Sequence, residues 1–373
     1  MHIGIDCRLP TYRMGGISRY TIHIIQALGR LAGDERFTIF HSRREARSFL
    51  PPGDGRFDRR NLWTPCHHRF ERQALAVELW PHQLDVVHSP DFIPPAAGAR
   101  RRVITVHDLT FLLYPEFLTA ESRRYYSDQI RWAVAAADHI LSDSEATRRD
   151  LLAMLDVAPS KVTTVHLAAN PVHTAHYPAE TVARTAAEYG VGRGFILFVG
   201  TLEPRKNLVM LLHAYRKLRD SGAVDVPLVL AGGRGWIYEE IFRTIEGLLL
   251  TDHVIHLEAV PDEKLAHLYR AAGVLAIPSH YEGFGLPALE AMHGGCPVVA
   301  STRGSLPEVV GQAAISLEPD DEAAWVDALA RVLTTPSLAE QMRAAGLAQA
   351  ARFTWESTAA ATLAVYRAVG AAI

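Results

Sequence analysis

The 373-residue sequence lacks the features that mark several specialised classes of protein. No stretch approaches the roughly 18 consecutive apolar residues that a membrane-spanning helix requires, so we expect no membrane span. Residues 1–6 contain no cationic segment leading into an apolar core, so we expect no secretory leader. The three cysteines, Cys7, Cys66 and Cys296, are far apart and have no metal-ligand spacing. This usage indicates buried thiols in a cytoplasmic protein.

The sequence also has no strong excess of either charge. It contains 38 Lys and Arg against 41 Asp and Glu, a formal net charge of −3 at pH 7. Residues 1–185 hold 23 basic and 20 acidic side chains, and residues 186–373 hold 15 and 21. Because phosphate-backbone binding depends on clustered cations, nucleic acid is not expected as a partner. The arginine clusters of the first half are either solvated surface or a surface for an anionic partner such as lipid phosphate: Arg43-Arg44, Arg59-Arg60, Arg100-Arg101-Arg102 and Arg123-Arg124.

Composition and apolar periodicity predict an α/β protein. Apolar residues make up 49% of the chain, as in globular proteins, and the length suits two domains. Short β-type runs alternate with longer amphipathic segments, which is typical of a parallel sheet wrapped by helices. The pattern occurs twice, so we predict two doubly wound, Rossmann-like domains with a cleft between them. The first spans residues 1–178 and the second residues 179–353, with a C-terminal helix at 354–373.

Local patterns predict where the individual elements lie. In the first half we expect strands at residues 2–7, 37–41, 85–89, 102–106, 139–142 and 162–166, and helices at 18–31, 121–137 and 145–155. In the second half we expect strands at 194–199, 227–231, 254–257, 274–277 and 297–300, and helices at 208–220, 238–250, 262–271 and 287–294. Residues 168–178, with their two prolines, are expected to form an irregular linker.

Residues that follow the expected strands are candidates for a site, because ligands of open parallel sheets lie beyond the carboxyl ends of strands. Gly15-Gly16 follows the first strand and precedes a helix that Ser18 could cap. Paired glycines let a backbone approach a ligand closely, although they also occur in ordinary loops. His107-Asp108 follows the strand at 102–106, and a histidine beside a carboxylate there is either functional or a hydrogen-bonded structural residue.

Two cations follow the first strand of the second half. The segment Gly200-Thr201-Leu202-Glu203-Pro204-Arg205-Lys206-Asn207 leads into a helix. Cations at a helix N-terminus oppose the helix macrodipole, so an anion should compensate them, and a diphosphate would do so. The alternative is a pair of solvated side chains on a loop.

A glycine-rich loop with two glutamates lies further along. It contains Glu282, Gly283, Phe284, Gly285 and Leu286, and Pro287 suits the first position of a short helix that carries Glu290. Exposed amides around residues 284–286 would form a cradle for anionic or hydroxyl oxygens, and the flanking carboxylate can accept hydrogen bonds from sugar hydroxyls.

At these residues the chain resembles the retaining glycosyltransferases of family 4, the group 1 enzymes of GT-B fold, and among them the mannosyltransferases. The resemblance spans essentially the whole chain. Six motifs carry it in order: Gly15-Gly16-Ile17-Ser18-Arg19-Tyr20, Val106-His107-Asp108-Leu109, Ser144-Glu145, residues 200–207, Ala231-Gly232-Gly233 and residues 282–290. The chain departs from the family pattern at Glu258-Ala259, where glycine followed by a large residue is usual.

The resemblance implies an enzyme that transfers a hexose from a nucleotide sugar, with retention, to a glycan or lipid-diphosphate-linked acceptor. It implies an acceptor-side first domain, a donor-binding second domain, and a final helix that crosses back to the first domain. The implied catalytic residues are His107, Arg205, Lys206 and Glu282, and the implied donor-binding residues are Gly15, Gly16, Gly200, Arg205, Lys206, Glu282, Gly283, Phe284, Gly285, Leu286 and Glu290.

Each of these residues has an implied role. Arg205 and Lys206 would neutralise the donor diphosphate, and Glu282 would hold hydroxyls of the transferred sugar. Glu290 would bind the ribose, and His107 would lie beside the anomeric centre or the primary hydroxyl of the sugar. Gly16 would let its loop close over the phosphates. There is no Asp-x-Asp motif to place a divalent ion on the phosphates, so no metal or other cofactor is expected.

The sequence does not identify the donor or the acceptor. The motifs most resemble family members that use GDP-mannose in surface polysaccharide assembly, with UDP-glucose and UDP-N-acetylglucosamine as alternatives. Two alternative functions are a nucleotide-sugar epimerase of the same fold and a non-catalytic module that binds sugar nucleotides. We expect a cytoplasmic location, with peripheral contact at the inner membrane face as an alternative, and the oligomeric state is unknown.

Overall fold

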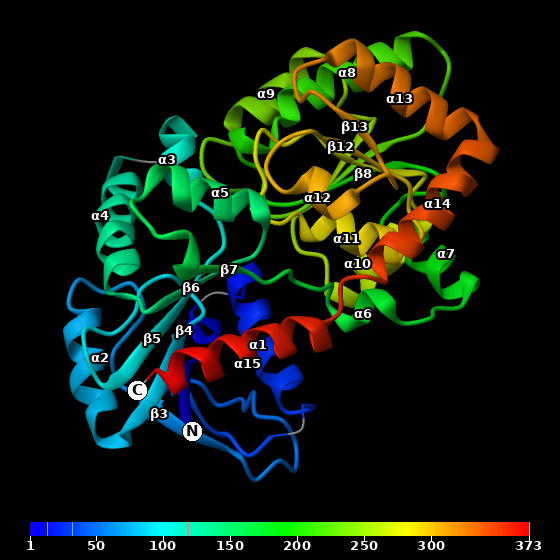
Figure 1. Ribbon diagram of the computed structural model, residues 1–373. Helices are drawn as coiled ribbons and strands as arrows, with labels where there is room; N and C mark the ends of the chain where they lie inside the picture. Colours follow the sequence, from blue (N-terminus) through cyan, green and yellow to red (C-terminus); the bar gives the residue numbers. More distant parts are fainter. Residues whose placement is uncertain (13, 32, 118–119, 373) are drawn as a thin grey trace. The chain divides into compact units, whose positions relative to one another are not determined.

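The computed structural model describes residues 1–12, 14–31, 33–117 and 120–372, without the side chains of residues 120–124. Its contacts divide the chain into two units. Unit 1 comprises Met1–Leu113, Thr119–Ala168 and Thr354–Ile373, and unit 2 comprises Tyr114–Leu118 and Ala169–Phe353. Each unit is built on one sheet in which all strand pairs of the described residues are parallel, which confirms the predicted α/β class (Figure 1).

The sheet of unit 1 has seven strands in the order β3-β2-β1-β4-β5-β6-β7. They are β1 (His2–Asp6), β2 (Arg36–Ser42), β3 (Phe57–Leu62), β4 (Leu84–Ser89), β5 (Ala99–Val106), β6 (His139–Ser142) and β7 (Val162–Thr164). The helices are α1 (Gly16–Leu28), α2 (Glu71–Leu79), α3 (Thr110–Leu113), α4 (Ala120–Ala136), α5 (Glu145–Met154) and α15 (Trp355–Ala371). Ile3 and Ile5 on β1 are fully buried, as expected for a central parallel strand covered on both faces.

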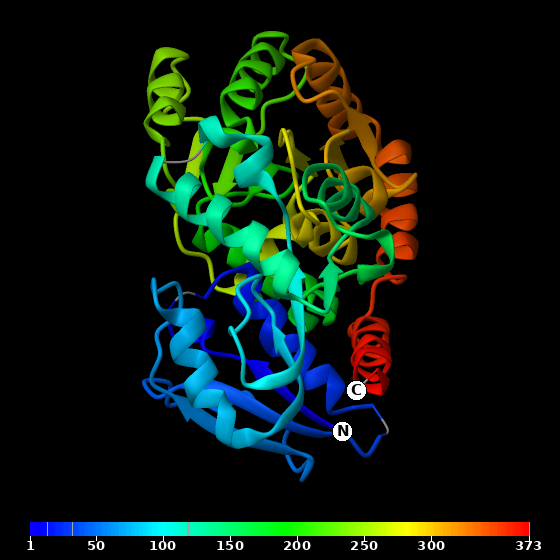
Figure 2. The same ribbon diagram turned by 60° about the vertical axis from the view of Figure 1, so that its left-hand side comes forward.

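The C-terminal helix α15 belongs to unit 1. It packs beside α1, and in Figure 1 and Figure 2 the two chain ends lie close together on this unit. The hydroxyl of Thr358 donates to the carbonyl of His166 at 2.7 Å, and the hydroxyl of Tyr366 lies 2.6 Å from Nδ1 of His88, which is buried at the end of β4. These bonds join α15 to the sheet it covers.

The sheet of unit 2 has six strands in the order β10-β9-β8-β11-β12-β13. They are β8 (Ile196–Val199), β9 (Leu228–Ala231), β10 (Val254–Leu257), β11 (Val274–Ile277), β12 (Val298–Ser301) and β13 (Ile315–Leu317). The helices are α6 (Pro171–Thr174), α7 (Ala179–Glu188), α8 (Leu208–Asp220), α9 (Glu239–Gly247), α10 (Asp262–Ala271), α11 (Leu286–His293), α12 (Leu306–Val310), α13 (Glu322–Thr334) and α14 (Pro336–Ala350). Apolar residues of α8, α9 and α13 form one core with alternate residues of the strands, and α10 and α11 lie on the other face (Figure 1).

The predicted elements are present with ends that differ by a few residues, and the departures have local causes. β3 was not predicted because its sequence, FDRRNL, is polar, as suits an edge strand. Ser18 does not cap α1: the helix begins at Gly16 after Gly15, and Ser18 is buried inside its first turn. The segment at 168–178 is not a plain linker, because Asn170 caps α6 and donates to Asp262 at 3.0 Å, which holds it on unit 2.

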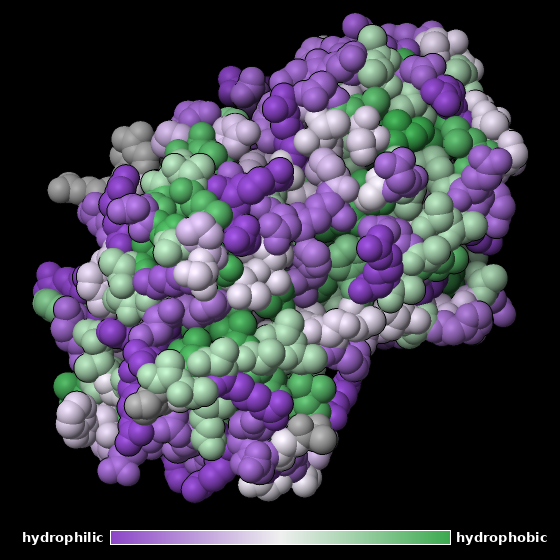
Figure 3. Space-filling view, viewed as in Figure 1, coloured by the Kyte–Doolittle hydropathy of each residue, from purple (hydrophilic) through white to green (hydrophobic). Residues whose placement is uncertain are grey.

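Among the described residues, no helix is long and apolar enough to cross a membrane. On the face shown in Figure 3, hydrophilic and hydrophobic residues are interspersed.

Candidate active site

Two loops meet at the carboxyl edge of the sheet in unit 2. The strand order places β8 beside β11, and this is where the winding of the sheet reverses. Such reversals are the usual ligand sites of open α/β sheets. The loop after β8 contains a short 3₁₀ turn, Pro204–Lys206, and the loop after β11 contains Glu282. The amide of His280 donates to the carbonyl of Arg205 at 2.9 Å, so the two predicted motifs lie side by side.

The side chains of these loops form a buried ion-pair cluster. Nζ of Lys206 donates to both carboxylate oxygens of Glu282, at 2.7 and 2.9 Å. Nη1 of Arg205 lies 3.3 Å from Oε2 of Glu282, and Nη2 of Arg205 donates to Oε1 of Glu203 at 2.6 Å. The hydroxyl of Ser279 donates to Oε1 of Glu282 at 2.6 Å. Lys206 and Glu282 are 8% and 7% exposed, so water screens these charges only weakly.

The charges of the cluster depend on one another. Burial alone would raise the pKa of Glu282, but the charges of Lys206 and Arg205 lower it to about 2. Burial and the charge of Arg205 lower the pKa of Lys206, and Glu282 opposes that effect only in part. The anion that compensates the two cations in this structure is therefore internal, supplied by Glu282 and Glu203, which sequence reasoning did not foresee.

Glycines shape the backbone around the cluster. A Cβ on Gly232 would lie 1.9 Å from the carbonyl oxygen of Gly200, so the loop after β8 can approach β9 only without a side chain. Gly304 has a φ of +60°, and a Cβ there would lie 2.3 Å from the carbonyl oxygen of Glu282. A Cβ on Gly200 itself would lie 3.6 Å from Cε of Lys206. Gly200 thus lies beside the ammonium group of Lys206.

The glycine-rich loop is more buried than predicted. Gly283, Phe284 and Gly285 are buried, and the ring of Phe284 packs edge-on against Phe353 with centroids 5.9 Å apart. Gly285, with a φ of +91°, is the N-cap of α11, which begins at Leu286. Pro287 is therefore in the second rather than the first helical position. Residues 283–285 therefore pack into unit 2, and the cradle of amides at 284–286 stays a prediction.

Glu290 lies on α11 with partners outside the cluster. Its Oε2 accepts a hydrogen bond from the hydroxyl of Tyr269 at 2.9 Å, and its Oε1 lies 3.5 Å from Nε2 of His173. Glu290 is 8% exposed. Both predicted glutamates are thus buried, and Glu282 contacts the two cations.

His107 in unit 1 is held by both of its ring nitrogens. Nδ1 lies 2.5 Å from Oδ2 of Asp143, which follows β6, and Nε2 lies 2.8 Å from the carbonyl oxygen of Pro90. A carbonyl and a carboxylate only accept hydrogen bonds, so both nitrogens donate and the ring is an imidazolium. Burial would lower the pKa of His107, but Asp143 raises it to about 9. Sequence reasoning missed Asp143, although it follows a strand directly and precedes the Ser144-Glu145 motif.

The glycine pair lies at the start of α1, whose next turn contacts this histidine. The ring of Tyr20 packs edge-on against His107 with centroids 5.2 Å apart, and its hydroxyl lies 3.1 Å from that of Thr105. A Cβ on Gly16 would meet no atom within 4 Å. The motifs at Gly15-Gly16 and at His107 thus converge within unit 1.

The arginine triplet, Arg100, Arg101 and Arg102, has partners within unit 1. Nη1 of Arg101 donates to Asp138 at 3.0 Å, Nη1 of Arg102 donates to the carbonyl of Ala96 at 3.0 Å, and Arg100 lies 3.7 Å from Asp85. The side chains of Arg123 and Arg124 lie outside the described residues.

Comparison with known proteins decides the family. Residues 184–349 match the family model described as glycosyl transferases group 1, and residues 14–173 match that of glycosyltransferase family 4. The chain is 31% identical to O-antigen chain mannosyltransferase B of Escherichia coli, over 95% of this chain and 97% of that protein. The chain is a family 4 glycosyltransferase.

Solved structures confirm the GT-B fold of this glycosyltransferase. Sucrose-phosphate synthase from Thermosynechococcus elongatus superimposes with a TM-score of 0.78 at 20% identity, over 100% of both chains. The Anabaena protein HepE in complex with UDP and glucose superimposes with a TM-score of 0.75 at 16% identity, over 99% of this glycosyltransferase and 100% of that chain.

Proposed function

We propose that this glycosyltransferase moves a hexose from a nucleotide sugar to a hydroxyl of a glycan or lipid-linked glycan in surface polysaccharide synthesis, with retention at the anomeric carbon. The observation that carries the proposal is the buried cluster of Arg205, Lys206 and Glu282 at the reversal point of the sheet in unit 2. Its two cations, which Glu282 and Glu203 neutralise in this structure, suit a diphosphate that exchanges for part of these contacts, and Glu282 suits the hydroxyls of the sugar.

The cluster supplies the charge that bond cleavage demands. When the anomeric carbon separates from the diphosphate, negative charge grows on the leaving oxygen. Fixed cations lower the free energy of that state without reorganising. An ammonium has three donors, and Lys206 uses two on Glu282. Lys206 can therefore contact a phosphate oxygen and keep a bond to Glu282, whose carboxylate is then available to sugar hydroxyls. This chemistry requires no metal ion.

His107 is assigned an electrostatic and positioning role. Both of its nitrogens carry protons and are engaged, so it is not a general base at neutral pH. The proton of the acceptor hydroxyl would pass to the leaving phosphate, which becomes more basic as the bond breaks. Attack from the face that the phosphate leaves gives retention.

Mannose from GDP-mannose is the proposed donor substrate. The relative that shares 31% identity over nearly the whole chain is named as a mannosyltransferase. UDP-glucose is the second candidate, because the Anabaena protein of the same fold binds UDP and glucose. UDP-N-acetylglucosamine is the third candidate donor. Epimerisation of the donor is the alternative reaction to be tested.

A panel of nucleotide sugars tests the proposal. Thermal unfolding is measured with GDP-mannose, UDP-glucose and UDP-N-acetylglucosamine, since a ligand at 100 times its dissociation constant stabilises a fold by about 2.7 kcal/mol. Transfer is then assayed with mannosides as acceptors, and the donor is analysed without acceptor for an epimerised sugar. Stabilisation by GDP-mannose and an α-linked mannosyl product are expected. An epimerised donor, or no response to any nucleotide sugar, contradicts the proposal.

Peripheral contact with an anionic membrane is proposed as the setting for a lipid-linked acceptor. The support is the basic first half of the chain, with 23 basic against 20 acidic side chains in residues 1–185. Arg100 offers the most accessible charge of the arginine triplet, with its side chain 66% exposed.

A further inference from the structure

Three buried side chains from three helices of unit 2 meet at Glu290. Glu290 lies on α11, Tyr269 on α10 and His173 on α6, and these helices pack against one another. The three residues are 8%, 0% and 2% exposed, in that order. Burying a carboxylate is costly unless its oxygens have partners. The partners of Glu290 therefore decide how its carboxylate is oriented.

The two oxygens of the Glu290 carboxylate contact different side chains. The hydroxyl of Tyr269 donates to Oε2 at 2.9 Å, and Nε2 of His173 lies 3.5 Å from Oε1. The ring of His173 also packs edge-on against the ring of Tyr269, with centroids 5.5 Å apart. Rotation of the carboxylate would thus disturb both contacts at once.

The backbone of His173 is fixed to α10 as well. Nη2 of Arg270, the residue after Tyr269, donates to the carbonyl oxygen of His173 at 2.8 Å and to that of Ala175 at 2.6 Å. Helix α10 therefore supplies a hydroxyl to the carboxylate of Glu290 and a guanidinium to the backbone of α6. The segment that was predicted to be a linker reaches Glu290 in a defined conformation.

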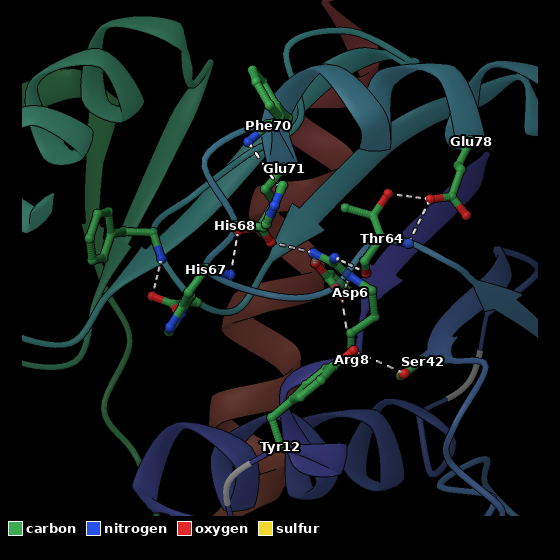
Figure 4. A network of polar contacts seen from close by, with 12 residues as sticks. Asp6, Arg8, Tyr12, Ser42, Thr64, His67, His68, Phe70, Glu71 and Glu78 are labelled. Atoms are coloured by element: carbon green, nitrogen blue, oxygen red, sulfur yellow. Dashed lines mark hydrogen bonds and ion pairs between the residues drawn. The ribbon is translucent and has the colours of Figure 1, made fainter.

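Unit 1 contains a buried carboxylate network of a different kind (Figure 4). Nη2 of Arg8 donates to Asp6 and to Glu71, at 2.6 Å in each case, and Arg8 is 1% exposed. A guanidinium is always charged, so it compensates the charge of these carboxylates. The hydroxyl of Tyr269 is a neutral donor. It orients the carboxylate of Glu290 without neutralising it.

Glu290 lies close to the ion-pair cluster along the chain. Helix α11 begins at Leu286, shortly after Glu282 in the preceding loop. Four residues of helix advance about 6 Å along its axis, so Glu290 lies about one turn beyond that loop. In a nucleotide sugar the ribose is joined directly to the diphosphate. This spacing suits a diphosphate at Arg205 and Lys206 with its ribose at Glu290.

We propose that His173 and Tyr269 are positioning residues for the donor, which hold the carboxylate of Glu290 in the orientation that accepts from the two adjacent hydroxyl groups of the ribose. The inference rests on the proposed function and makes it more specific, because the motifs of the family resemblance include Glu290 but neither of its two partners. A carboxylate accepts at both oxygens, and adjacent hydroxyls offer two matching donors. Fixing the carboxylate in advance lowers the entropic cost of binding.

The test compares nucleotides with and without ribose hydroxyls on the full chain. Calorimetry measures the dissociation constants of GDP, UDP and their 2′,3′-dideoxy counterparts. We expect the wild type to bind the preferred ribonucleotide at least about tenfold more tightly than its dideoxy counterpart. Tyr269→Phe and His173→Leu should each weaken the ribonucleotide about three- to tenfold, the size of one hydrogen bond, and leave the dideoxy nucleotide nearly unchanged.

Three further variants separate positioning from a structural role. Tyr177→Phe is the matched control, because it removes a hydroxyl that donates to the carbonyl of Val172 at 3.0 Å in the same segment, and it should keep the preference for ribose. His173→Gln keeps a side-chain N–H and should restore most of the affinity that His173→Leu loses. Tyr269→Phe should have no further effect when it is added to Glu290→Gln, since it acts through that carboxylate.

The positioning role is wrong if the folded variants bind ribonucleotides like the wild type, or if they weaken both kinds of nucleotide alike. It is also wrong if Tyr269→Phe weakens binding further in the Glu290→Gln protein. Melting temperatures establish folding, and because His173→Leu and Tyr269→Phe are independent changes, either one alone is decisive.

Transfer from GDP-mannose and UDP-glucose to mannosides is assayed in parallel. A preference for ribose that depends on His173 and Tyr269, without any sugar transfer, supports the positioning role and contradicts the transferase function. Sugar transfer with an unchanged preference in both variants contradicts the positioning role alone. Failure of the wild type to bind either ribonucleotide contradicts both proposals.

Discussion

Replacement of Lys206 by alanine tests the ion-pair cluster of unit 2 most directly. The carboxyl of Glu282 has its pKa lowered from 4.5 to about 2, chiefly by Lys206 and Arg205 acting against burial. At 1.4 kcal/mol per pH unit, that difference corresponds to about 3 kcal/mol in favour of the ionised form at neutral pH. Arg205 at 3.3 Å and Ser279 at 2.6 Å remain in Lys206→Ala. The loss of folding stability should be of about this size, because removal of one partner of a buried ion pair typically costs about 3–5 kcal/mol.

The replacement should also lower turnover strongly. Lys206 is proposed to contact charge that grows during bond cleavage, and removal of one such donor typically lowers turnover 10²- to 10³-fold. Donor binding should weaken less, because the ground-state diphosphate keeps Arg205. Turnover is measured at saturating GDP-mannose, the dissociation constant by calorimetry, and stability by urea unfolding.

A matched control is available on the same unit. Lys217 on α8 is 67% exposed and pairs with Glu322 at 2.9 Å. Such a surface pair contributes little to stability, and Lys217→Ala should behave like the wild type in all three measurements. A folded Lys206→Ala protein with turnover within about twofold of the wild type would refute the assignment of Lys206 to the leaving group.

The remaining predictions concern pH, backbone space, metal and membrane. Because Asp143 raises the pKa of His107 from 6.5 to about 9, protonated His107 contributes stability that is fully present below pH 6.5 and lost as pH rises through 9. Between those pH values, the unfolding free energy of the wild type should fall by about 3 kcal/mol, and that of Asp143→Asn should not. Urea unfolding measures both, and an equal fall in the two proteins would contradict this prediction. Gly232→Ala should lower the unfolding free energy by about 1–3 kcal/mol, because the added Cβ would clash with Gly200. Gly247→Ala is the control, because its Cβ would meet no atom within 4 Å. Equal melting temperatures of the two variants would contradict the close approach of Gly232 to Gly200. Sugar transfer should continue at its normal rate in excess EDTA, and a loss that Mg²⁺ or Mn²⁺ restores would contradict the metal-free mechanism. The wild type should float with anionic but not neutral vesicles at low salt, and substitution of the arginine triplet by glutamine should reduce this binding; indifference to anionic vesicles removes the membrane proposal.

The sequence by itself determined the α/β class, the two sheets and most of their elements. Alternation of apolar runs with amphipathic segments is a local signal, and it predicted β10 (Val254–Leu257), β11 (Val274–Ile277) and α8 (Leu208–Asp220) to the residue. Edge strands carry a weaker signal, which is why polar β3 and the three-residue β13 were not predicted. Motif order along the chain was enough to indicate the family.

Only the tertiary structure decided which charged groups neutralise which. Lys206 and Glu282 are far apart in the sequence, and they meet because β8 and β11 are neighbours in the sheet. The sequence predicted an anion for the two cations, and folding also places Glu282 and Glu203 beside them. In the same way Asp143 reaches His107 because β5 and β6 are adjacent. Local periodicity specifies elements, whereas strand order is set by the packing of the whole sheet, and it is strand order that assembles these sites.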